Sequence, residues 1–378
     1  MSNSGYSAPN DLRIEWLTRI GEIEALEPQW RALEESAQDR TVFSTFDWIV
    51  AWYHHYAGER GNPLVGVART AEGVLGVAPL VLWNGRLAGV PVRRVDFAGH
   101  NSEAGEFLLA NDRPELAGHL LQSLLKRGGF DFVCLNHMDT GSRRFSAMEQ
   151  ALSATRCRFE RVPTRDAVVD IQHGFEAYSQ GFTSNFRRNL KRREKKMSGL
   201  GHWKIERFSS VTEAALGSFV ERSFDIFDAS WKARVGGPLG SSHRGFYREV
   251  AERFARRGML DLSILSVGGK DAAFIMALVE RGGYYDCSIS FTEAFDNLSP
   301  GTFLIVEVLK LLPQQGVHTV VSHGDHEYKR FWASAFVNDT RAFIFRPSPR
   351  AQISRLMRFK VLPLFSRGKR DAERGQNG

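Results

Sequence analysis

One order of elements occurs twice in this chain, once before residue 140 and once after residue 260. Each time the pattern predicts a β-hairpin, a third strand, a loop, an apolar helix, a glycine that ends the helix, and a buried strand. The last strands, Gly129-Phe130-Asp131-Phe132-Val133 and Gly316-Val317-His318-Thr319-Val320, are alike in pattern and not in identity. We therefore expect two copies of one α/β domain, and a ligand is commonly bound between two such domains.

The second copy shows its turns clearly. Strands are predicted at residues 260–267, 271–280 and 284–291, separated by the glycine pairs Gly268-Gly269 and Gly282-Gly283. A helix is predicted from Ser299-Pro300-Gly301-Thr302, where Ser299 suits the N-cap and Pro300 the first helical position. Small residues at a helix start can hold a phosphate, because the first N–H groups have no partner there. An ordinary helix start is the competing interpretation, and this stretch alone favours it.

The net charge of +7 is concentrated in two segments. Residues 186–196 hold seven basic residues and one acid, and residues 350–378 hold eight and two, so each segment carries +6 and the remainder −5. A mildly acidic remainder argues against a broad nucleic-acid-binding face. The first segment has helix-forming composition, with Phe186, Leu190, Arg193 and Met197 on one face. It is either a solvated linker helix or a clamp for an anionic group.

The cysteines and the apolar runs indicate a cytoplasmic protein. Three cysteines lie far apart, which fits a reducing compartment and excludes a zinc site built on a cysteine pair. The first ten residues lack the pattern of a signal peptide, and no apolar run approaches the roughly 20 residues that span a bilayer. The stretch 353–365 is predicted as a short basic amphipathic helix, and the last dozen residues as disordered.

Aromatic residues are dense between Phe43 and Tyr56, in a stretch with helical spacing. A protein core or a domain interface is the expected role. A stacking surface for a sugar or a lipid is the alternative, and it requires that the rings face a cleft.

Six motifs, in order and spacing, cover nearly the whole chain and resemble one family. Together they resemble the FemAB-like, two-domain branch of the GNAT acyltransferases, the group called CelD or BioF2-like acetyltransferases. The motifs are Val42-Phe43-Ser44-Thr45-Phe46-Asp47-Trp48 with Trp52, Ala78-Pro79-Leu80-Val81, Phe186-Arg187-Arg188-Asn189-Leu190-Lys191-Arg192-Arg193-Glu194, Ala229-Ser230-Trp231-Lys232, Ser299-Pro300-Gly301 and Gly324-Asp325-His326-Glu327-Tyr328-Lys329.

The resemblance implies an α/β (α+β) fold with tandem GNAT-like domains, each a mixed, largely antiparallel sheet flanked by helices. The expected division is an N-terminal domain at 1–172, a basic linker helix region at 173–203, and a C-terminal domain with the acyl-donor site at 204–346. A basic, partly disordered tail follows at 347–378.

The resemblance also implies transfer of an acyl group from acetyl-CoA, or another acyl-CoA, to an amine or hydroxyl. Members are associated with exopolysaccharide and cell-envelope biosynthesis. The sequence departs from standard GNAT enzymes in lacking their Gln/Arg-x-x-Gly-x-Gly/Ala loop, and offers only Ser299-Pro300-Gly301-Thr302. Fem-type transfer from aminoacyl-tRNA is the close rival, and a non-catalytic polysaccharide-assembly protein is a third interpretation.

In such a fold the donor would lie where the third strand of the second domain meets the helix that opens at Ser299-Pro300-Gly301-Thr302. Backbone N–H groups of Gly301 and Thr302 would hold the pyrophosphate, while Lys329 would bind a phosphate or an anionic acceptor. The predicted site residues have further roles. Asp325 and Glu327 are base candidates, Tyr328 would return a proton to the thiolate, and Trp231, Lys232, Arg187 and Arg188 would contact substrate.

For Asp325 and Lys329 the competing interpretations are a turn residue and a surface lysine. No metal is expected, because His323 and His326 beside Asp325 do not form a ligand pattern. The expected acceptor is a small molecule or a polysaccharide or lipid precursor, with nucleic acid only if tRNA supplies the acyl group. The basic tail suggests peripheral contact with the inner membrane face, and the oligomeric state is open.

Overall fold

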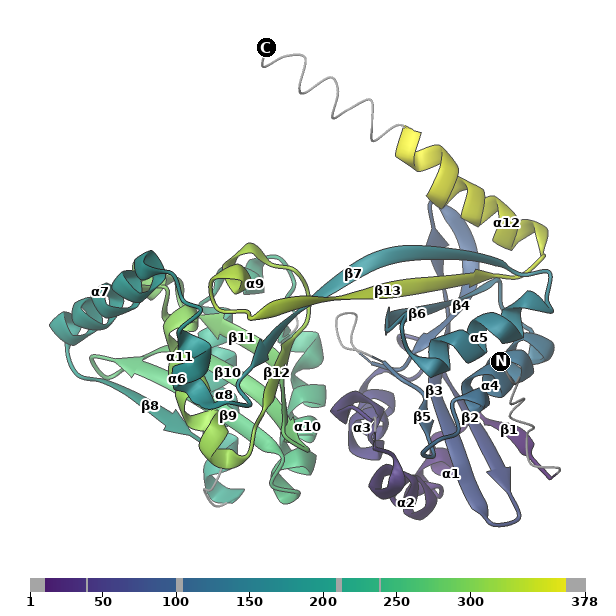
Figure 1. The fold of residues 1–378 in the computed structure, drawn as a ribbon, viewed down its shortest axis with the longest axis horizontal. Coiled ribbons are helices and arrows are strands. Elements are labelled where there is room, and N and C mark those ends of the chain that lie inside the picture. Colours follow the sequence, from purple (N-terminus) through teal and green to yellow (C-terminus); the bar gives the residue numbers. More distant parts are fainter. Residues whose placement is uncertain (1–10, 39, 100–104, 209–212, 238, 365–378) are drawn as a thin grey trace. The chain divides into compact units, whose positions relative to one another are not determined.

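The computed structural model describes residues 11–38, 40–99, 105–208, 213–237 and 239–364, which form two compact units (Figure 1). Unit 1 comprises Met1–Pro163 and Asp339–Gly378, and unit 2 comprises Thr164–Asn338. This division differs from the one expected at residues 172, 203 and 346. The chain leaves unit 1 within one strand and returns within another, so unit 1 consists of two separate runs of sequence and unit 2 of a single run.

Unit 1 is built on a mixed sheet. Its strands follow the order β1, β2, β3, β4, β6 and β13, and only the β4–β6 pair is parallel. The strands are β1 (Arg13–Leu17), β2 (Asn62–Thr70), β3 (Gly73–Leu87), β4 (Val90–Phe97), β5 (Leu108–Leu109, on β3), β6 (Phe132–Met138) and β13 (Ala335–Phe345). The helices are α1 (Ile20–Glu24), α2 (Glu27–Ser36), η1 (Val42–Ser44), α3 (Phe46–Tyr56), α4 (Glu115–Arg127), α5 (Arg143–Ser153), α12 (Pro349–Leu356) and η6 (Met357–Val361).

Unit 2 repeats that arrangement. Its strands follow the order β8, β9, β10, β11, β12 and β7, and again only the fourth pair, β11–β12, is parallel. The strands are β8 (Trp203–Arg207), β9 (Leu260–Val267), β10 (Lys270–Glu280), β11 (Gly283–Phe291), β12 (Thr319–Ser322) and β7 (Arg158–Asp170). The helices are α6 (Gly174–Ser179), α7 (Ser184–Leu200), α8 (Glu213–Asp228), α9 (Trp231–Arg234), η2 (Ser241–His243), α10 (Arg244–Arg256), η3 (Glu293–Leu298), α11 (Pro300–Leu311), η4 (Leu312–Gln315) and η5 (Glu327–Phe331).

The duplication expected from the sequence is thus confirmed, strand by strand and direction by direction. What the pattern did not reveal is the origin of the sixth strand in each unit. The residues of β7 that pair with β12 come from a strand that starts in unit 1, and the residues of β13 that pair with β6 come from a strand that starts in unit 2. This exchange explains why the observed division differs from the expected boundaries.

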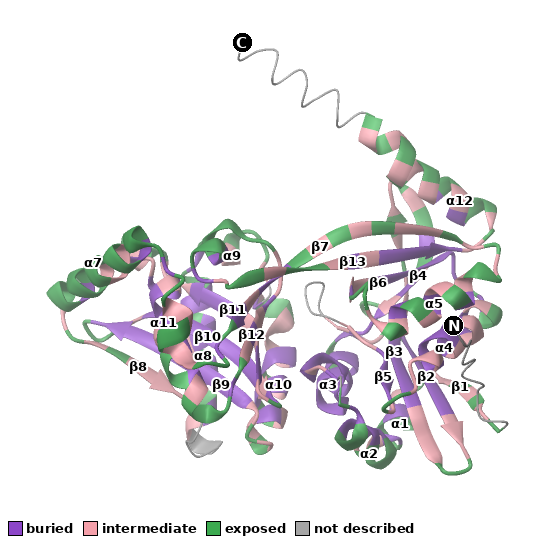
Figure 2. Cartoon of the chain, viewed as in Figure 1, coloured by how far each residue is buried: buried purple, intermediate pink, exposed green. Residues whose placement is uncertain are grey.

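The basic segment is anchored to unit 2 and is not a free linker. In α7, Phe186 and Met197 are buried in the same apolar cluster as Phe303 and Leu304 of α11, while most of the basic side chains are exposed (Figure 2). Burying one such side chain stabilises a fold by about 1.5–3 kcal/mol. The helix is capped by Thr183, whose hydroxyl accepts a hydrogen bond from the N–H of Phe186.

The region 43–56 forms η1 and α3, and its aromatic rings are almost entirely buried. Across the described ranges, no helix has both the length and the apolarity needed to cross a bilayer. Residues 353–364 are helical and basic, as predicted, and the last dozen residues lie outside the described part of the chain.

Candidate functional site

Two strands of unit 2 diverge next to the motif residues. β11 pairs with β12 only at Gly283, Tyr284 and Tyr285, although β11 continues to Phe291. The two strands separate at Asp286, whose carboxylate accepts a hydrogen bond from the Ser322 hydroxyl at the end of β12. We call this place the fork of unit 2. Backbone groups of β11 beyond it have no partner on β12 and can therefore serve a ligand.

A β-bulge coincides with the fork. Met276 of β10 lies opposite Ser288, and the next residue, Ala277, lies opposite Asp286, so Cys287 is the extra residue. A bulge bends its strand and increases the local twist. It therefore gives a physical reason for β11 to leave β12 at this point. Bulges also re-aim side chains, and the residue before this one is the acidic Asp286.

Lys232 and Lys329 bring two ammonium groups to the fork. The Nζ of Lys232 donates to the carbonyl of Ile289 at 2.5 Å, on the unpaired part of β11, and Lys329 donates to the carbonyl of His323. Burial lowers the pKa of both lysines, while the charge of Asp286 opposes that shift in each. Asp286 is therefore close enough to both cations to act on them electrostatically.

Lys329 is 3% exposed, so it is not the surface lysine of the competing interpretation. With Nζ bonded to His323, it is better suited to shaping the charge of the fork than to contacting a phosphate directly. Lys232 is partly exposed and lies at the start of α9, which an ion pair between Arg234 and Glu293 ties to η3, the element that follows β11.

The three predicted catalytic residues lie in different settings. Asp325 is engaged by Arg165 at 3.1 Å and by Arg330 at 3.5 Å, so a substrate would have to displace a guanidinium to reach it. Glu327 is exposed on η5. Tyr328 follows it, and burial raises the pKa of its hydroxyl, with a further contribution from Asp286. Tyr328 thus stays protonated at neutral pH and can donate a proton near the fork.

The helix start predicted to hold a phosphate is formed as expected in position. α11 begins at Pro300, with Ser299 at the N-cap; the Ser299 side chain makes no capping bond, because the residue adopts a left-handed conformation (φ 48°). No acidic residue lies in the first turn. A Cβ at Gly301 would lie 3.5 Å from Phe291 and 3.6 Å from Ile289, and both residues belong to the part of β11 that does not pair with β12. The fork and the helix start therefore face each other.

The predicted substrate contacts are accessible, though spread out. Trp231 is 47% exposed and lies beside Lys232. Arg187 and Arg188 are exposed on α7, where Arg188 donates to Asn185. Of the residues predicted from motifs, Lys232, Tyr328, Lys329 and the start of α11 lie at or near the fork. Arg187 and Arg188 lie apart from it, on the exposed face of α7.

The sequence argument missed Asp286 and two buried hydroxyls, those of Ser288 and Ser290. Neither hydroxyl has a hydrogen-bond partner within the described ranges, and both residues are at most 5% exposed. The available signal was the run Asp286-Cys287-Ser288-Ile289-Ser290, which places three polar residues in an otherwise buried strand. Such an interruption of an apolar pattern marks a candidate functional position.

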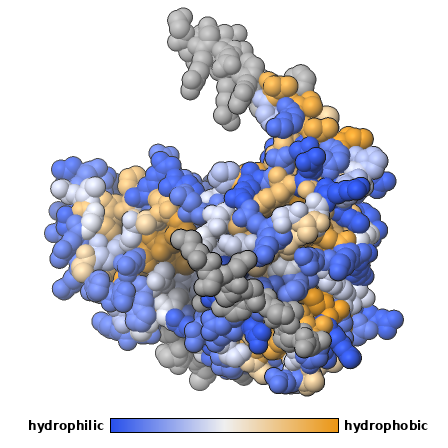
Figure 3. Space-filling view, turned by 45° about the vertical axis from the view of Figure 1, so that its right-hand side comes forward, coloured by the Kyte–Doolittle hydropathy of each residue, from blue (hydrophilic) through white to orange (hydrophobic). Residues whose placement is uncertain are grey.

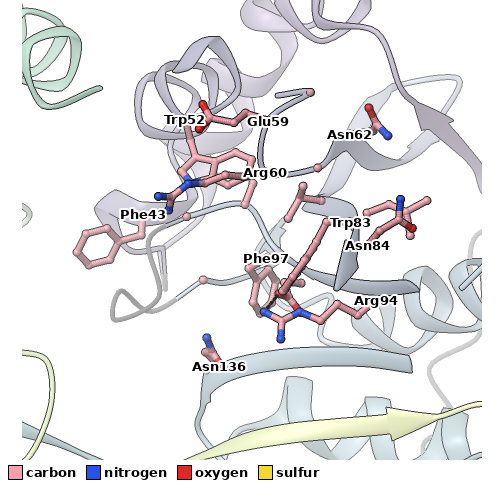
Figure 4. A pocket seen from close by; sticks show the side chains of 18 of the residues that line it. Phe43, Trp52, Glu59, Arg60, Asn62, Trp83, Asn84, Arg94, Phe97 and Asn136 are labelled. Atoms are coloured by element: carbon pink, nitrogen blue, oxygen red, sulfur yellow. Dashed lines mark hydrogen bonds and ion pairs between the residues drawn. The ribbon is translucent and has the colours of Figure 1, made fainter. Parts of the chain in front are cut away.

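Unit 1 has a corresponding fork, where β4 and β6 diverge, and a cavity of about 510 Å³ lies there (Figure 4). These two strands pair at Arg94, Val95 and Asp96, and the cavity lies beyond that point. In Figure 4, Trp52 and Arg60 lie on one side, and Trp83, Phe97 and Arg94 on the other. The alternative role predicted for residues 43–56, a stacking surface whose rings face a cleft, is therefore met in part, because Phe43, Trp48 and Trp52 line a cavity.

The polar groups of this cavity are fixed in place. The Arg94 guanidinium stacks 3.5 Å from the centre of the Trp83 ring, and Asp96 accepts hydrogen bonds or ion pairs from Trp83 at 2.7 Å and Arg94 at 2.6 Å. The other oxygen of Asp96, Oδ1, is buried and has no partner within the described ranges. At the rim, Gly61 has φ +133°, and a Cβ there would lie 2.8 Å from that of Trp83.

Residues 184–330 match the family described as an acetyltransferase (GNAT) domain. No curated protein gives a sequence match. Solved structures with a similar fold include FemX, with a TM-score of 0.58 and 11% identity over 90% of this chain and 99% of that one.

Two further solved structures share the fold. The C-terminal domain of a protein assigned as a lysylphosphatidylglycerol synthetase from Agrobacterium fabrum has a TM-score of 0.55, with 14% identity over 91% of this chain and 98% of that one. L-PGS from Bacillus licheniformis has a TM-score of 0.51, with 10% identity over 88% and 97%. At these identities the likeness concerns the fold alone. The family match thus concerns residues 184–330, which resemble a GNAT acetyltransferase domain, and over most of the chain the fold is shared with FemX.

Proposed function

We propose that this protein transfers an acyl group from a coenzyme A thioester, bound at the fork of unit 2, to an amine or hydroxyl. The observation that carries the proposal is the fork itself. An unpaired strand edge, an unblocked helix start and Asp286 near two lysines come together there. The match of residues 184–330 to an acetyltransferase family supports this type of chemistry.

Each part of the fork has a role in the proposed reaction. First-turn N–H groups at Gly301 and Thr302 bind the pyrophosphate, since a helix start attracts anions. Amides of the donor pair with the free edge of β11. Asp286 accepts the proton of the acceptor as its nitrogen or oxygen attacks the thioester carbon. The carbon–sulfur bond then breaks, and the Tyr328 hydroxyl protonates the leaving thiolate.

The proposal is tested by titrating the purified protein calorimetrically with acetyl-CoA, a longer acyl-CoA and free coenzyme A. Saturable binding of the thioesters is expected. If neither thioester binds, transfer from coenzyme A is excluded, and aminoacyl-tRNA becomes the donor to test.

Transfer from aminoacyl-tRNA is the second candidate, because the fold resembles that of FemX and α7 presents exposed Arg187 and Arg188. Under this alternative, charged tRNA binds, its affinity falls steeply with salt, and replacing both arginines by alanine weakens it. Binding of acetyl-CoA without binding of charged tRNA decides for the first proposal.

We further propose that the cavity of unit 1 binds the acceptor as a neutral, polyhydroxylated ring. Aromatic walls stack on the apolar face of a sugar, and the fixed polar groups orient its hydroxyls. The only ionisable residues among the described lining are Glu59, Arg60, Arg94 and Asp96, so the charges balance and an uncharged ligand fits. A hydroxyl that donates to Asp96 Oδ1 would supply the partner this buried oxygen lacks.

The test is a titration with methyl glycosides of glucose, galactose, mannose and N-acetylglucosamine, and with choline as a cationic competitor. We expect at least one glycoside to saturate the site, and Arg94→Ala to weaken binding by about tenfold. Arg93→Ala is the matched control, because Arg93 is the exposed neighbour of Arg94 on β4 and does not line the cavity. Binding of choline alone, or equal losses in both variants, would contradict the proposal.

A further inference from the structure

The C-terminal helix of unit 1 is firmly held on one side. α12 continues through η6 to residue 364 without a break in helical structure. The Ser348 hydroxyl caps α12 by accepting from the N–H of Ala351, and Arg355 bonds to Glu160 at 2.6 Å. Phe359 packs edge-on against Phe343 and Phe345 of β13. The orientation of the helix is therefore fixed, and its outer side is a defined surface.

That outer side is apolar to an unusual degree. Ile353 is 53% exposed, Leu356 45% and Leu364 67%. Of the eleven large hydrophobic side chains exposed in the described ranges, four lie within residues 353–364, so exposure is concentrated on this one helix. Figure 3 shows hydrophobic residues gathered beside the last described residues of the chain. Helix residues three apart share a side, which places Ile353 and Leu356 together.

The charges around this apolar surface are all of one sign. Arg350, Arg358 and Lys360 are exposed on the same helix, and residues 349–364 contain no acidic residue. The following sequence, 365–378, adds four basic residues against two acids. A second copy of the same basic helix would repel this one, whereas an anionic surface would attract it.

We propose that residues 349–364 dock the protein on an anionic lipid bilayer, with Ile353, Leu356 and Leu364 entering the interface and the basic side chains contacting lipid headgroups. A helix with an apolar side and flanking cations binds this way without spanning the membrane. The inference is independent of the acyl-transfer proposal, because the helix contributes nothing to either fork.

The experiment is co-sedimentation of the full chain with vesicles of phosphatidylcholine alone and with about 30% phosphatidylglycerol, at low and high salt. Binding to the anionic vesicles is expected, with little binding to neutral ones and weaker binding at high salt. The variant Ile353→Asp/Leu356→Asp should bind about tenfold or more weakly, since it places two charges in the apolar side. Arg358→Glu/Lys360→Glu should also weaken binding.

A matched control separates this helix from general basicity. Lys195→Ala/Lys196→Ala removes two exposed cations from α7 and should leave vesicle binding within about twofold of the unaltered protein. Light scattering of the same proteins tests the alternative occupant, a second copy of the chain.

Three results would overturn the proposal. They are absence of binding to anionic vesicles, a loss that follows the α7 variant instead, and a dimer that Ile353→Asp/Leu356→Asp dissolves. Circular dichroism and thermal melting of each variant ensure that a loss of binding is not a loss of folding.

Discussion

Units 1 and 2 share one strand order, yet the residues at their two forks differ. In unit 2, the helix after the fork starts with Pro300 and Gly301, and its first turn has no acid. In unit 1, the corresponding helix α4 starts with Glu115, a carboxylate where a phosphate would have to bind. A negative charge satisfies a helix start and repels an anion there. Of these two corresponding helices, α11 is therefore the one whose first turn leaves room for an anion.

The two forks also differ in the cavity and in the charges beside them. The fork of unit 1 opens into a cavity with aromatic walls, where Asp96 is paired with Arg94. At the fork of unit 2, Asp286 instead lies near two lysines whose pKa values burial lowers. A duplicated sheet can therefore keep its hydrogen-bond plan while the residues at its two forks diverge, and we propose that one copy carries out the chemistry and the other binds the acceptor.

The largest expected effect concerns Asp286, the proposed base of unit 2. Asp286→Asn keeps the shape and removes the carboxylate, so kcat for acyl transfer should fall by about 10²–10⁴-fold. Asp325→Asn should lower kcat by less than about tenfold, because Arg165 and Arg330 already engage that carboxylate. Steady-state kinetics with saturating donor measure both, and the reverse order would make Asp325 the base.

The two helix starts give the next effect. Gly301→Glu places a carboxylate at the start of α11, as Glu115 does in α4, and should weaken acyl-CoA binding by about 100-fold or more. Gly301→Ala is the control. Its Cβ meets only ordinary contact distances of 3.5–3.6 Å, so binding should change by less than about fivefold. Calorimetric titration measures both. Equal affinity of the Glu variant and the unaltered protein would remove this helix start from the donor site.

Helix caps test whether the exchanged strands couple the two units. Thr183→Ala in unit 2 and Ser142→Ala in unit 1 each remove a side-chain cap and should cost about 1 kcal/mol of unfolding free energy. Because β7 and β13 each contribute to both units, we expect one unfolding transition that both variants shift alike. Differential scanning calorimetry would show this. Two separate transitions, each moved by one variant, would mean that the units unfold independently.

The smallest effect is the opposite pH dependence of stability at the two forks. Burial raises the pKa of Asp96, so the folded state holds that proton longer, and stability falls as pH rises from 3.8 through the folded pKa. Burial lowers the pKa of Lys232 and Lys329, so the folded state releases these protons at a lower pH than the unfolded state does. Stability then rises as pH climbs from the folded pKa values toward 10.5.

Urea unfolding of the unaltered protein, Asp96→Asn and Lys232→Met across these pH ranges measures the two contributions. Asp96→Asn should gain stability relative to the unaltered protein across the acidic window. Lys232→Met should lose part of the alkaline rise. Parallel curves for all three proteins would show that neither fork contributes to the pH dependence of stability.

The motif residues show how far sequence could lead toward the site. Lys232, Lys329 and the start of α11 were found because each lies in a short pattern of recognisable chemistry. Asp286 was not, because a lone acid within an apolar strand gains its meaning from Lys232 and Lys329, which lie 54 and 43 positions away in the sequence. The pairing of Asp325 with Arg165 was equally hidden, since it joins residues 160 positions apart.

Sequence by itself determined the duplicated order of strands and helices, the position of α11 and the basic amphipathic character of α7 and α12. These are local properties, because turns, caps and side-chain periodicity depend on residues a few positions apart. Only the tertiary structure decided which strand completes each sheet, that a bulge at Cys287 opens the fork, and that the rings near residue 50 line a cavity. These depend on strand pairing and packing between distant segments, which no local pattern encodes.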